Sequence, residues 1–222
     1  NMRICIIGGG LTSLALAKAL VNQSIHVDIL GDRKKKTIDQ SRTIGITKSN
    51  VEYFNNNIIN INKKIWKLNK IEIFSEKLNQ EKLLEFQNNN QELFSMVRSF
   101  DLYNILEKSL RGNKFFKKKF LNNVINFSSK YDLIINLDFT SFISRKFFSK
   151  KIKKRYKSFA YSGILQHQKI KNKVAIQIFT KFGPLAFLPI SDCETSIVYS
   201  VKNANNFEYK NLFELINSYN PK

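Results

Sequence analysis

The beginning of the chain, from Met2 to Asp32, constrains the fold more than any other stretch. Arg3 to Ile7 is an apolar run of strand length, and the triplet Gly8-Gly9-Gly10 follows it directly. Leu11 to Val21 is rich in Leu and Ala and predicts a helix, whereas His26 to Leu30 predicts a second strand. A strand, a glycine turn, a helix, a second strand and an acid, in this order, indicate a nucleotide-binding βαβ unit.

The residues of the turn have distinct roles in this interpretation. Gly8 permits a tight turn, Gly10 lets the backbone approach a diphosphate, and the first amides of the helix point at that anion with the helix dipole behind them. Ser13 stands at the third glycine position, where a small residue allows close packing of helix and strand. Asp32 follows at the distance of about 20 residues expected for an acid that binds a ribose hydroxyl, although Gly31 holds the usual place of that acid. The candidate nucleotide-binding residues are therefore Gly8, Gly10, Leu11, Thr12, Ser13 and Asp32; in the alternative interpretation the glycines only form a turn.

The charge balance of the chain is strongly basic. There are 37 Lys and Arg residues against 17 Asp and Glu residues, for a formal net charge of +20. Nucleic acid and an anionic membrane surface are the partners that such a charge favours. The lysines are spread along the chain in short runs, however, and Lys, Asn, Ile and Phe are abundant together, as AT-rich codons would produce. We therefore expect no nucleic-acid partner, and we keep peripheral contact with an anionic membrane surface as an open expectation.

The cysteines, histidines and hydropathy pattern exclude several other classes. Cys5 lies inside the first expected strand, Cys193 is isolated, and neither belongs to a Cys-x-x-Cys pair, so a reducing cytosol is the default. His26 and His167 are isolated as well, and we expect no metal site. No apolar run approaches the roughly 18 residues of a membrane span, and glycines interrupt the first run too early for a signal peptide. Because the first residue is Asn, we expect either that Met2 is the true start or that the chain is a cut piece.

Between residues 40 and 157 the chain alternates between helical and extended patterns. We expect, in order, a short strand or bend over 41–47, a helix from 49, a strand over 65–74, a loop or an excursion between strands over 79–91, a helix over 92–110, a basic linker over 114–119, a strand over 131–138 and a linker or domain boundary over 144–155. Arg42 either pairs with a phosphate above the glycine turn or is only an exposed cation. Arg98 lies on the expected helix, and in the alternative interpretation it is only a charged residue on the solvated face of that helix. Asp138 ends an apolar strand, which suits a ligand at the carboxyl edge of a parallel sheet.

From Tyr156 onward the apolar periodicity changes to two, which predicts antiparallel strands. The expected strands are 161–166, 173–179, 186–188 and 195–201, with turns at Gly183-Pro184 and Ser191-Asp192 and a final helix over 208–218. The sequence therefore predicts an α/β chain in which a Rossmann-like βαβ domain is followed by part of an antiparallel-sheet domain.

Four stretches carry a resemblance to a known family. They are the glycine turn at 6–13, the arginine segment Ser41 to Ile46, the helix Val97 to Leu106 with its Arg-x-x-x-Leu-x-x-x-Leu spacing, and Gly183-Pro184-Leu185-Ala186-Phe187-Leu188-Pro189. In the same order, they resemble motifs of the flavin-dependent aromatic hydroxylases, and specifically of the branch that hydroxylates the ring of ubiquinone precursors. The last stretch is the most specific to that branch.

This resemblance implies a para-hydroxybenzoate-hydroxylase-like fold, with an FAD-binding domain over 1–157, a substrate-side excursion around 65–95, and the beginning of a substrate-binding antiparallel-sheet domain over 158–222. It implies FAD as the cofactor, NAD(P)H as the electron donor and a small aromatic substrate, a polyprenylated phenol, with Arg42, Arg98 and Asp138 near the cofactor. The cofactor would perform the oxygen chemistry while the protein holds it and excludes water, and no catalytic acid or base is assigned. The resemblance also implies a cytoplasmic protein, peripheral to the inner membrane face or to a ubiquinone-synthesis complex.

Two departures from the family pattern leave alternatives open. Where the family has Gly-Ala-Asp-Gly, this chain has Asn136-Leu137-Asp138-Phe139, and Phe139 adds bulk where the backbone should approach the diphosphate. The Gly-Asp-Ala-Ala-His segment of the family does not occur before Lys222, so we expect the N-terminal portion of a longer hydroxylase. The alternatives are a non-catalytic relative that acts as a binding or scaffold protein, and another FAD or NAD oxidoreductase that shares only the first βαβ unit.

Overall fold

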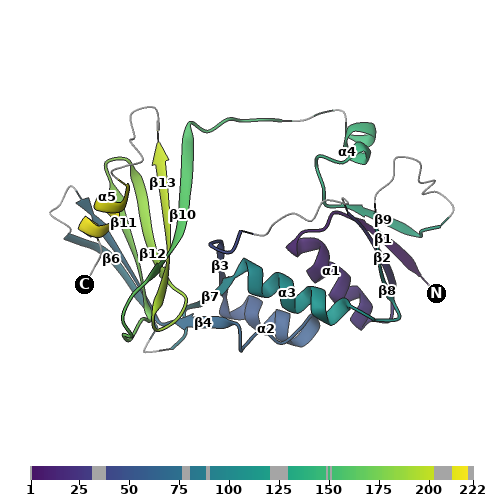
Figure 1. Ribbon diagram of the computed structural model, residues 1–222, viewed down its shortest axis with the longest axis horizontal. Coiled ribbons are helices and arrows are strands. Elements are labelled where there is room, and N and C mark those ends of the chain that lie inside the picture. Colours follow the sequence, from purple (N-terminus) through teal and green to yellow (C-terminus); the bar gives the residue numbers. More distant parts are fainter. Residues whose placement is uncertain are drawn as a thin grey trace. The chain divides into compact units, whose positions relative to one another are not determined.

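The computed structural model describes residues 2–31, 39–76, 81–88, 91–120, 130–148, 150, 152–202 and 212–219. The chain divides into two compact units, and each draws on three separate stretches of sequence. The first unit comprises Asn1–Gln40, Ser49–Lys64 and Arg98–Lys153, and the second comprises Ser41–Lys48, Ile65–Val97 and Lys154–Lys222. Figure 1 labels the elements of both units.

The first unit is built on a four-stranded parallel sheet in the order β8-β2-β1-β9. Its strands are β1 (Arg3–Ile7), β2 (His26–Gly31), β8 (Phe116–Phe120) and β9 (Leu133–Asn136). In the central strand β1, Ile7 is paired with Leu30 on one side and with Asn136 on the other. The run Ile4 to Ile7 is almost completely buried. A continuous apolar strand of this kind is what a parallel sheet covered on both faces requires.

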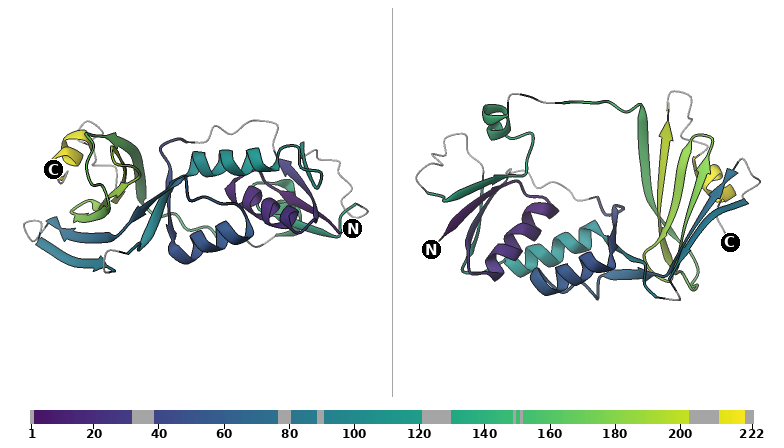
Figure 2. Two further views of the ribbon diagram at one scale, coloured as in Figure 1. Left: turned by 90° about the horizontal axis from the view of Figure 1, so that it is seen from below. Right: turned by 180° about the vertical axis from the view of Figure 1, so that it is seen from behind.

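Two helices of the first unit, α1 (Leu11–Asn22) and α3 (Ser99–Leu110), lie side by side (Figure 1, Figure 2). Each turns one apolar stripe inward at helical spacing. The buried apolar residues are Leu14, Ala17 and Val21 in α1, and Leu102, Leu106 and Leu110 in α3. The expected helix over 11–21 and the C-terminal part of the expected helix over 92–110 are therefore both stabilised by packing of their apolar stripes inside the first unit.

The other two helices of the first unit are α2 (Lys48–Asn57) and α4 (Phe142–Phe147). The Asn22 side chain at the end of α1 donates hydrogen bonds to the carbonyls of Asn57 and Ile58, at 3.0 and 2.9 Å, and so ties α2 to α1. Ile143 of α4 packs into the cluster formed by Cys5, Ile7 and Leu30 of the parallel sheet. In the part of the chain that the structure describes, no helix is both long and apolar enough to cross a membrane.

The second unit contains two sheets. The larger one has the order β10-β13-β12-β11-β5-β6, and all its neighbouring strands are antiparallel except β11 and β5. Its strands are β5 (Lys70–Ser75), β6 (Glu81–Gln87), β10 (Ser158–Gln166), β11 (Val174–Thr180), β12 (Gly183–Pro189) and β13 (Glu194–Lys202). The smaller sheet has the order β3-β7-β4, with β3 (Thr43–Thr47), β4 (Ile65–Leu68) and β7 (Phe94–Arg98).

The core of the second unit forms between the larger sheet and the last helix, α5 (Leu212–Tyr219). Leu185, Tyr199 and Val201 are completely buried in it. The Tyr199 hydroxyl lies 2.9 Å from Thr180 Oγ1, which supplies the polar partner that a buried phenol needs. The four antiparallel strands expected after residue 156 are all present, because the period-two apolar pattern matches the inward face of this sheet.

Two expectations for residues 65–91 are wrong. The expected single strand over 65–74 is broken at Asn69 into β4 and β5, which belong to different sheets. Of the two alternatives for 79–91, the loop is wrong, because this stretch contains β6, which pairs with β5 through Ile71 opposite Phe86 and Ile73 opposite Leu84. Pairing with β5 in a hairpin therefore overrides the polar composition of this stretch.

Two further expectations, for residues 92–119, are also corrected. The expected helix over 92–110 starts only at Ser99, because Phe94 to Val97 pair with β4 as strand β7. The expected linker over 114–119 contains β8, a lysine-rich edge strand whose partner is β2. In both cases the pairing partner lies far away in the sequence, so local periodicity could not identify the strand. In the expected linker or domain boundary over 144–155, α4 extends to Phe147, and the two units divide between Lys153 and Lys154.

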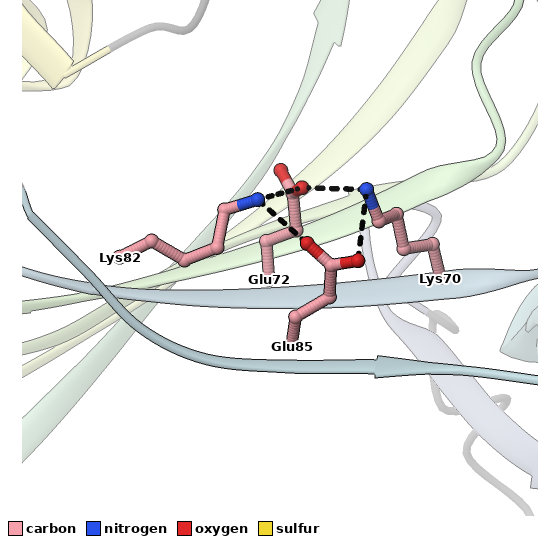
Figure 3. Close-up of polar contacts among 4 residues, drawn as sticks. All are labelled: Lys70, Glu72, Lys82 and Glu85. Atoms are coloured by element: carbon pink, nitrogen blue, oxygen red, sulfur yellow. Dashed lines mark hydrogen bonds and ion pairs between the residues drawn. The ribbon is translucent and has the colours of Figure 1, made fainter.

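Four charged side chains cover one face of the β5–β6 hairpin (Figure 3). Glu72 and Glu85 are direct cross-strand partners, and two lysines bridge them: Lys70 at 2.9 and 3.3 Å, and Lys82 at 2.8 and 2.6 Å. The hydrogen bond from Lys82 is the main cause that lowers the pKa of each carboxyl, and the hydrogen bond with Glu72 raises the pKa of Lys82. Charge on an outer strand discourages pairing with other chains, so we regard this cluster as structural.

Candidate functional site

The turn between β1 and α1 requires glycine at its first position. Gly8 has a φ of +124°, and its N–H donates to the carbonyl of Leu30 at 2.8 Å. A Cβ at this position would lie 3.1 Å from Ser13 Oγ and 3.4 Å from the carbonyl carbon of Leu137. Ser13 is itself buried, so its side chain occupies the space that the missing Cβ of Gly8 leaves. The small residue at the third glycine position thus packs helix against strand as the pattern requires.

The next two glycines face open space. A Cβ at Gly9 or Gly10 would meet no atom within 4 Å. Gly10 is the N-cap of α1 and has no side chain to satisfy the first helical N–H groups, and the first turn of α1 contains no acidic residue. Because the first N–H groups of a helix have no intrahelical partner, those of Leu11, Thr12 and Ser13 form a site suited to an anion.

A second turn lies beside the glycine turn, at the end of β9. The N–H of Leu137 donates to the carbonyl of Ile7 at 2.8 Å, which continues the pairing of β9 with β1. β2, the next strand in the chain, therefore pairs with one side of β1, and β9 pairs with the other side. The turns that follow β1 and β9 both lie at the carboxyl edge of the sheet. Ligands of open parallel sheets bind at such a point, where the strand order reverses.

The second turn is closed by its own side chains. One carboxylate oxygen of Asp138 accepts from the Thr140 N–H at 2.9 Å and from its hydroxyl at 2.6 Å. The Asn136 amide donates to Ser144 Oγ at 2.6 Å, and Ser144 Oγ donates to the Asp138 carbonyl at 2.8 Å. Phe139 is 74% exposed. At the positions where the family that this sequence resembles has glycines, this chain thus has a turn held by hydrogen bonds among its own polar groups, next to the exposed ring of Phe139.

The structure brings most of the candidate residues together at this edge. Gly8, Gly10, Leu11, Thr12 and Ser13 form the first turn, and Asp138 forms the second. Arg98 is the N-cap of α3, in the same unit. Arg42 belongs to the second unit, where it is exposed and directly precedes β3, and Asp32 lies outside the described residues. The cofactor-binding roles of all nine residues remain predictions.

Several polar groups of the first unit were not identified from the sequence. Ser99 Oγ, at the start of α3, is buried and has no hydrogen-bond partner in the described part of the chain. Asp28 is buried in β2, where it accepts hydrogen bonds from Lys119 Nζ at 2.5 Å and from the Tyr131 hydroxyl at 2.7 Å. Burial, reinforced by the charge of Asp28, raises the pKa of the Cys5 thiol to about 12, so Cys5 is a packed side chain and not a nucleophile.

These partners could not be found from sequence because they are distant along the chain. Lys119 and Tyr131 are 91 and 103 residues away from Asp28. An acid inside an apolar strand is the only local sign of such a cluster. Among the residues described here, no group of three or more His, Cys, Asp or Glu side chains gathers as a metal site would require.

The chain has a Rossmann-like parallel sheet and an antiparallel sheet, a fold that it shares with solved FAD-containing proteins, and this confirms the expected fold class. Solved structures with this fold include PqsL of Pseudomonas aeruginosa, a probable FAD-dependent monooxygenase. It has 12% identity and a TM-score of 0.71 over 90% of this chain and 60% of that one. HpxO of Klebsiella pneumoniae, solved with FAD and uric acid, has 14% identity and a TM-score of 0.71 over 98% of this chain and 61% of that one.

A third similar structure is the p-nitrophenol 4-monooxygenase PnpA of Pseudomonas putida DLL-E4. It has 9% identity and a TM-score of 0.73 over 97% of this chain and 62% of that one. At such identities the likeness concerns the fold, and this chain spans about three fifths of the length of these proteins. No protein-family model matches the chain, and no curated protein matches it in sequence.

Proposed function

We propose that this chain is the FAD-binding portion of a monooxygenase that hydroxylates a small aromatic molecule. One observation carries the proposal: the glycine turn is open at Gly9 and Gly10 and lies where the strand order of a parallel sheet reverses. The fold is shared with a protein solved with FAD and uric acid, and with a nitrophenol monooxygenase. These likenesses support a flavin and an aromatic substrate for this chain.

The residues of the turn fit the diphosphate of a dinucleotide. The free N–H groups at the start of α1 would bind its oxygens, and the missing side chains of Gly9 and Gly10 leave room for it. Asp32 would bind the ribose, and Arg42, Arg98 and Asp138 would lie near the remainder of the cofactor. Bound FAD, reduced by NAD(P)H, would supply the oxygen chemistry. The protein would hold the cofactor, and the larger sheet of the second unit would form one wall of the substrate pocket.

We further propose a polyprenylated phenol of ubiquinone synthesis as the substrate. The support is the stretch Gly183 to Pro189, which resembles the turn specific to that branch and forms the strand β12 in the middle of the larger sheet. A cytoplasmic location, with contact to the inner membrane face or to a ubiquinone-synthesis complex, belongs to this same proposal. Hydroxylation of a polyprenylated phenol by the flavin-loaded protein, measured by mass spectrometry, tests it.

A specific observation favours a second candidate, a non-catalytic relative that binds or scaffolds. Its support is the turn at 136–144, in which Asp138 is bonded to Thr140 and Phe139 replaces a glycine. A side chain at that position occupies space where backbone would approach a diphosphate. A stable protein that never takes up flavin would favour this candidate over the monooxygenase.

Flavin titration of the wild-type protein and of Gly10→Ala tests the proposed function. The added methyl meets no protein atom within 4 Å, and the φ of −86° suits any residue, so stability should fall by less than about 1 kcal/mol, the difference between glycine and alanine at an N-cap. The same methyl should weaken FAD binding about tenfold or more, because it enters the space of the diphosphate. Gly163→Ala is the matched control: it also adds a methyl in open space, but in β10. Equal FAD affinity in the wild-type protein and both variants would show that the glycine turn is not part of the FAD-binding site.

A further inference from the structure

The segment from Arg145 to Lys157 combines positive charge with large apolar side chains. Its cations are Arg145, Lys146, Lys150, Lys151, Lys153, Lys154, Arg155 and Lys157, and its large apolar residues are Phe147, Phe148, Ile152 and Tyr156. The sequence contains no Asp or Glu between Asp138 and Asp192, so no acid near in sequence offsets this charge. We call residues 145–157 the basic–aromatic segment.

The structure anchors the helix where this segment starts, and the described residues that follow are exposed. α4 is held to the parallel sheet by Ile143, and Ser141 Oγ caps it by accepting from the Ser144 N–H at 3.3 Å. Phe147 at the end of α4 and Phe148 after it are 66% and 65% exposed, and Ile152 is fully exposed. An exposed apolar pair therefore lies at the C-terminal end of the short helix α4, which Figure 1 labels and which Ile143 holds to the sheet.

The cations of the segment that the structure describes lie among these apolar side chains. Lys146 Nζ lies 5.5 Å from the centre of the Phe147 ring, and Lys154 Nζ lies 5.3 Å from that of Tyr156. Within the described ranges of the chain, no cation of the segment forms an ion pair. Biased codon usage explains an abundance of Lys and Phe, but not the exposure of several large apolar side chains within one short stretch. Exposed apolar side chains with a charged rim mark an interaction surface.

We propose that the basic–aromatic segment docks this protein onto the surface of a membrane that contains anionic phospholipids. The cations are attracted to the headgroups, while Phe147, Phe148 and Ile152 enter the boundary between headgroups and acyl chains. A nucleic acid also attracts cations and stacks on aromatic rings, but it offers no partner for a fully exposed aliphatic side chain such as Ile152. This proposal shares with the proposed function only the expected membrane contact, and it requires no bound flavin.

Vesicle binding of the purified full chain, without added flavin, provides the test. We expect binding to phosphatidylcholine vesicles that contain phosphatidylserine, and little binding to phosphatidylcholine alone. Each cation near an anionic surface contributes about fivefold in affinity, so replacing four of them should weaken binding by at least about 100-fold. High salt, about 1 M, should abolish most of the binding, because it shortens the screening length to about 3 Å.

Two variants at equal charge separate this segment from general basicity. The test variant carries Lys150→Gln, Lys153→Gln, Lys154→Gln and Arg155→Gln. The control carries Lys48→Gln, Lys63→Gln, Lys64→Gln and Lys108→Gln, which are exposed lysines elsewhere in the chain. All eight side chains are exposed, so both proteins should unfold at the temperature of the wild type. Equal vesicle affinity of the two variants would overturn the proposal, because net charge alone would then explain binding.

The apolar contribution is tested at the phenylalanine pair. Phe147→Ser with Phe148→Ser should weaken vesicle binding about tenfold or more and leave binding to double-stranded DNA unchanged. In Phe148→Trp, the fluorescence added by the new indole should shift to shorter wavelength on vesicles and be quenched by brominated acyl chains, whereas Trp66 in the parent protein should not respond. Unquenched fluorescence at position 148, or tighter binding to DNA than to anionic vesicles, would contradict insertion and identify a nucleic acid as the better partner.

Discussion

Gly8 in the first unit and Gly183 in the second both have a positive φ, of +124° and +141°, but their surroundings differ. Next to Gly8 there is open space, since a Cβ at Gly9 or Gly10 would meet no atom within 4 Å. At Gly183 there is no room for a side chain, since a Cβ would lie 2.1 Å from the carbonyl oxygen of Ser200 on the neighbouring strand. Glycine thus keeps space free for a ligand in one unit and lets two backbones approach in the other. A site can therefore be told from a packing contact by what the missing side chain would meet.

Gly183→Ala should have the largest effect on stability. The new Cβ would clash with a backbone atom of β13, which cannot rotate away, and the φ of +141° is unfavourable for alanine. We expect a loss of about 3 kcal/mol or more in the free energy of unfolding, measured by urea denaturation. Gly163→Ala in β10 of the same sheet is the control and should change stability by less than about 1 kcal/mol, because its Cβ meets nothing. A mild effect at Gly183 would show that β12 and β13 can separate there.

Gly8→Ala should destabilise the protein less, by about 1–3 kcal/mol, because the nearest side-chain atom is one that can shift, Ser13 Oγ at 3.1 Å. The double variant Gly8→Ala/Ser13→Gly removes that contact but keeps the unfavourable φ, so it should recover only part of the loss. A double-mutant cycle by urea denaturation measures the two parts. Full recovery would mean that side-chain crowding, and not the positive φ, is the reason for glycine at this position.

Asp28→Asn should cost about 1 kcal/mol at neutral pH, because it removes the charge from two hydrogen bonds inside the parallel sheet. Burial alone would raise the pKa of Asp28, but the hydrogen bonds from Lys119 and Tyr131 and the charge of Lys119 hold it below its usual 3.8. A lowered carboxyl pKa stabilises the folded state above the unfolded value, and this contribution is lost as the pH falls through the folded value. Between about pH 5 and pH 2 the stability of the wild type should therefore fall more steeply than that of Asp28→Asn. Parallel slopes in acid denaturation would contradict the assignment.

The smallest effects should come from the charged cluster on the β5–β6 hairpin (Figure 3), whose four side chains are all partly exposed to solvent. Lys82→Gln should destabilise more than Glu72→Gln, because it leaves the opposed carboxylates of Glu72 and Glu85 with only Lys70 between them. Both shifts in the thermal midpoint should be smaller than that of Asp28→Asn and should vanish at about 1 M salt. An effect that survives high salt would show that packing, and not charge, holds the hairpin.

In both units some elements follow from the sequence and others do not. In the first unit β1, α1 and β2 match the expected ranges closely, because an apolar run, a glycine and a helical stripe act over neighbouring residues. β8 of the same unit was missed, because its lysine-rich sequence forms a strand only beside β2. In the second unit the strands after residue 156 were predicted, whereas β6 and β7 were missed, because each forms a strand only beside its partner, β5 or β4.

The candidate site also contains features that the sequence located and features that it did not. The sequence located the glycine turn and its neighbours Leu11, Thr12 and Ser13 without help. It also located Asp138 at a strand end, but not the bonds to Thr140 that occupy its carboxylate. Those bonds depend on the conformation of a turn, and a single sequence does not show which turn a polar stretch adopts.

By itself the sequence determined the first βαβ unit, the glycine turn and the period-two strands of the larger sheet, because local periodicity and the conformational freedom of glycine act within a few residues. The tertiary structure decided the order of the strands, the charged partners of Asp28 and the outward position of Phe147 and Phe148. These depend on contacts between residues far apart in the chain. Such contacts form only when the ordered backbone brings the residues together.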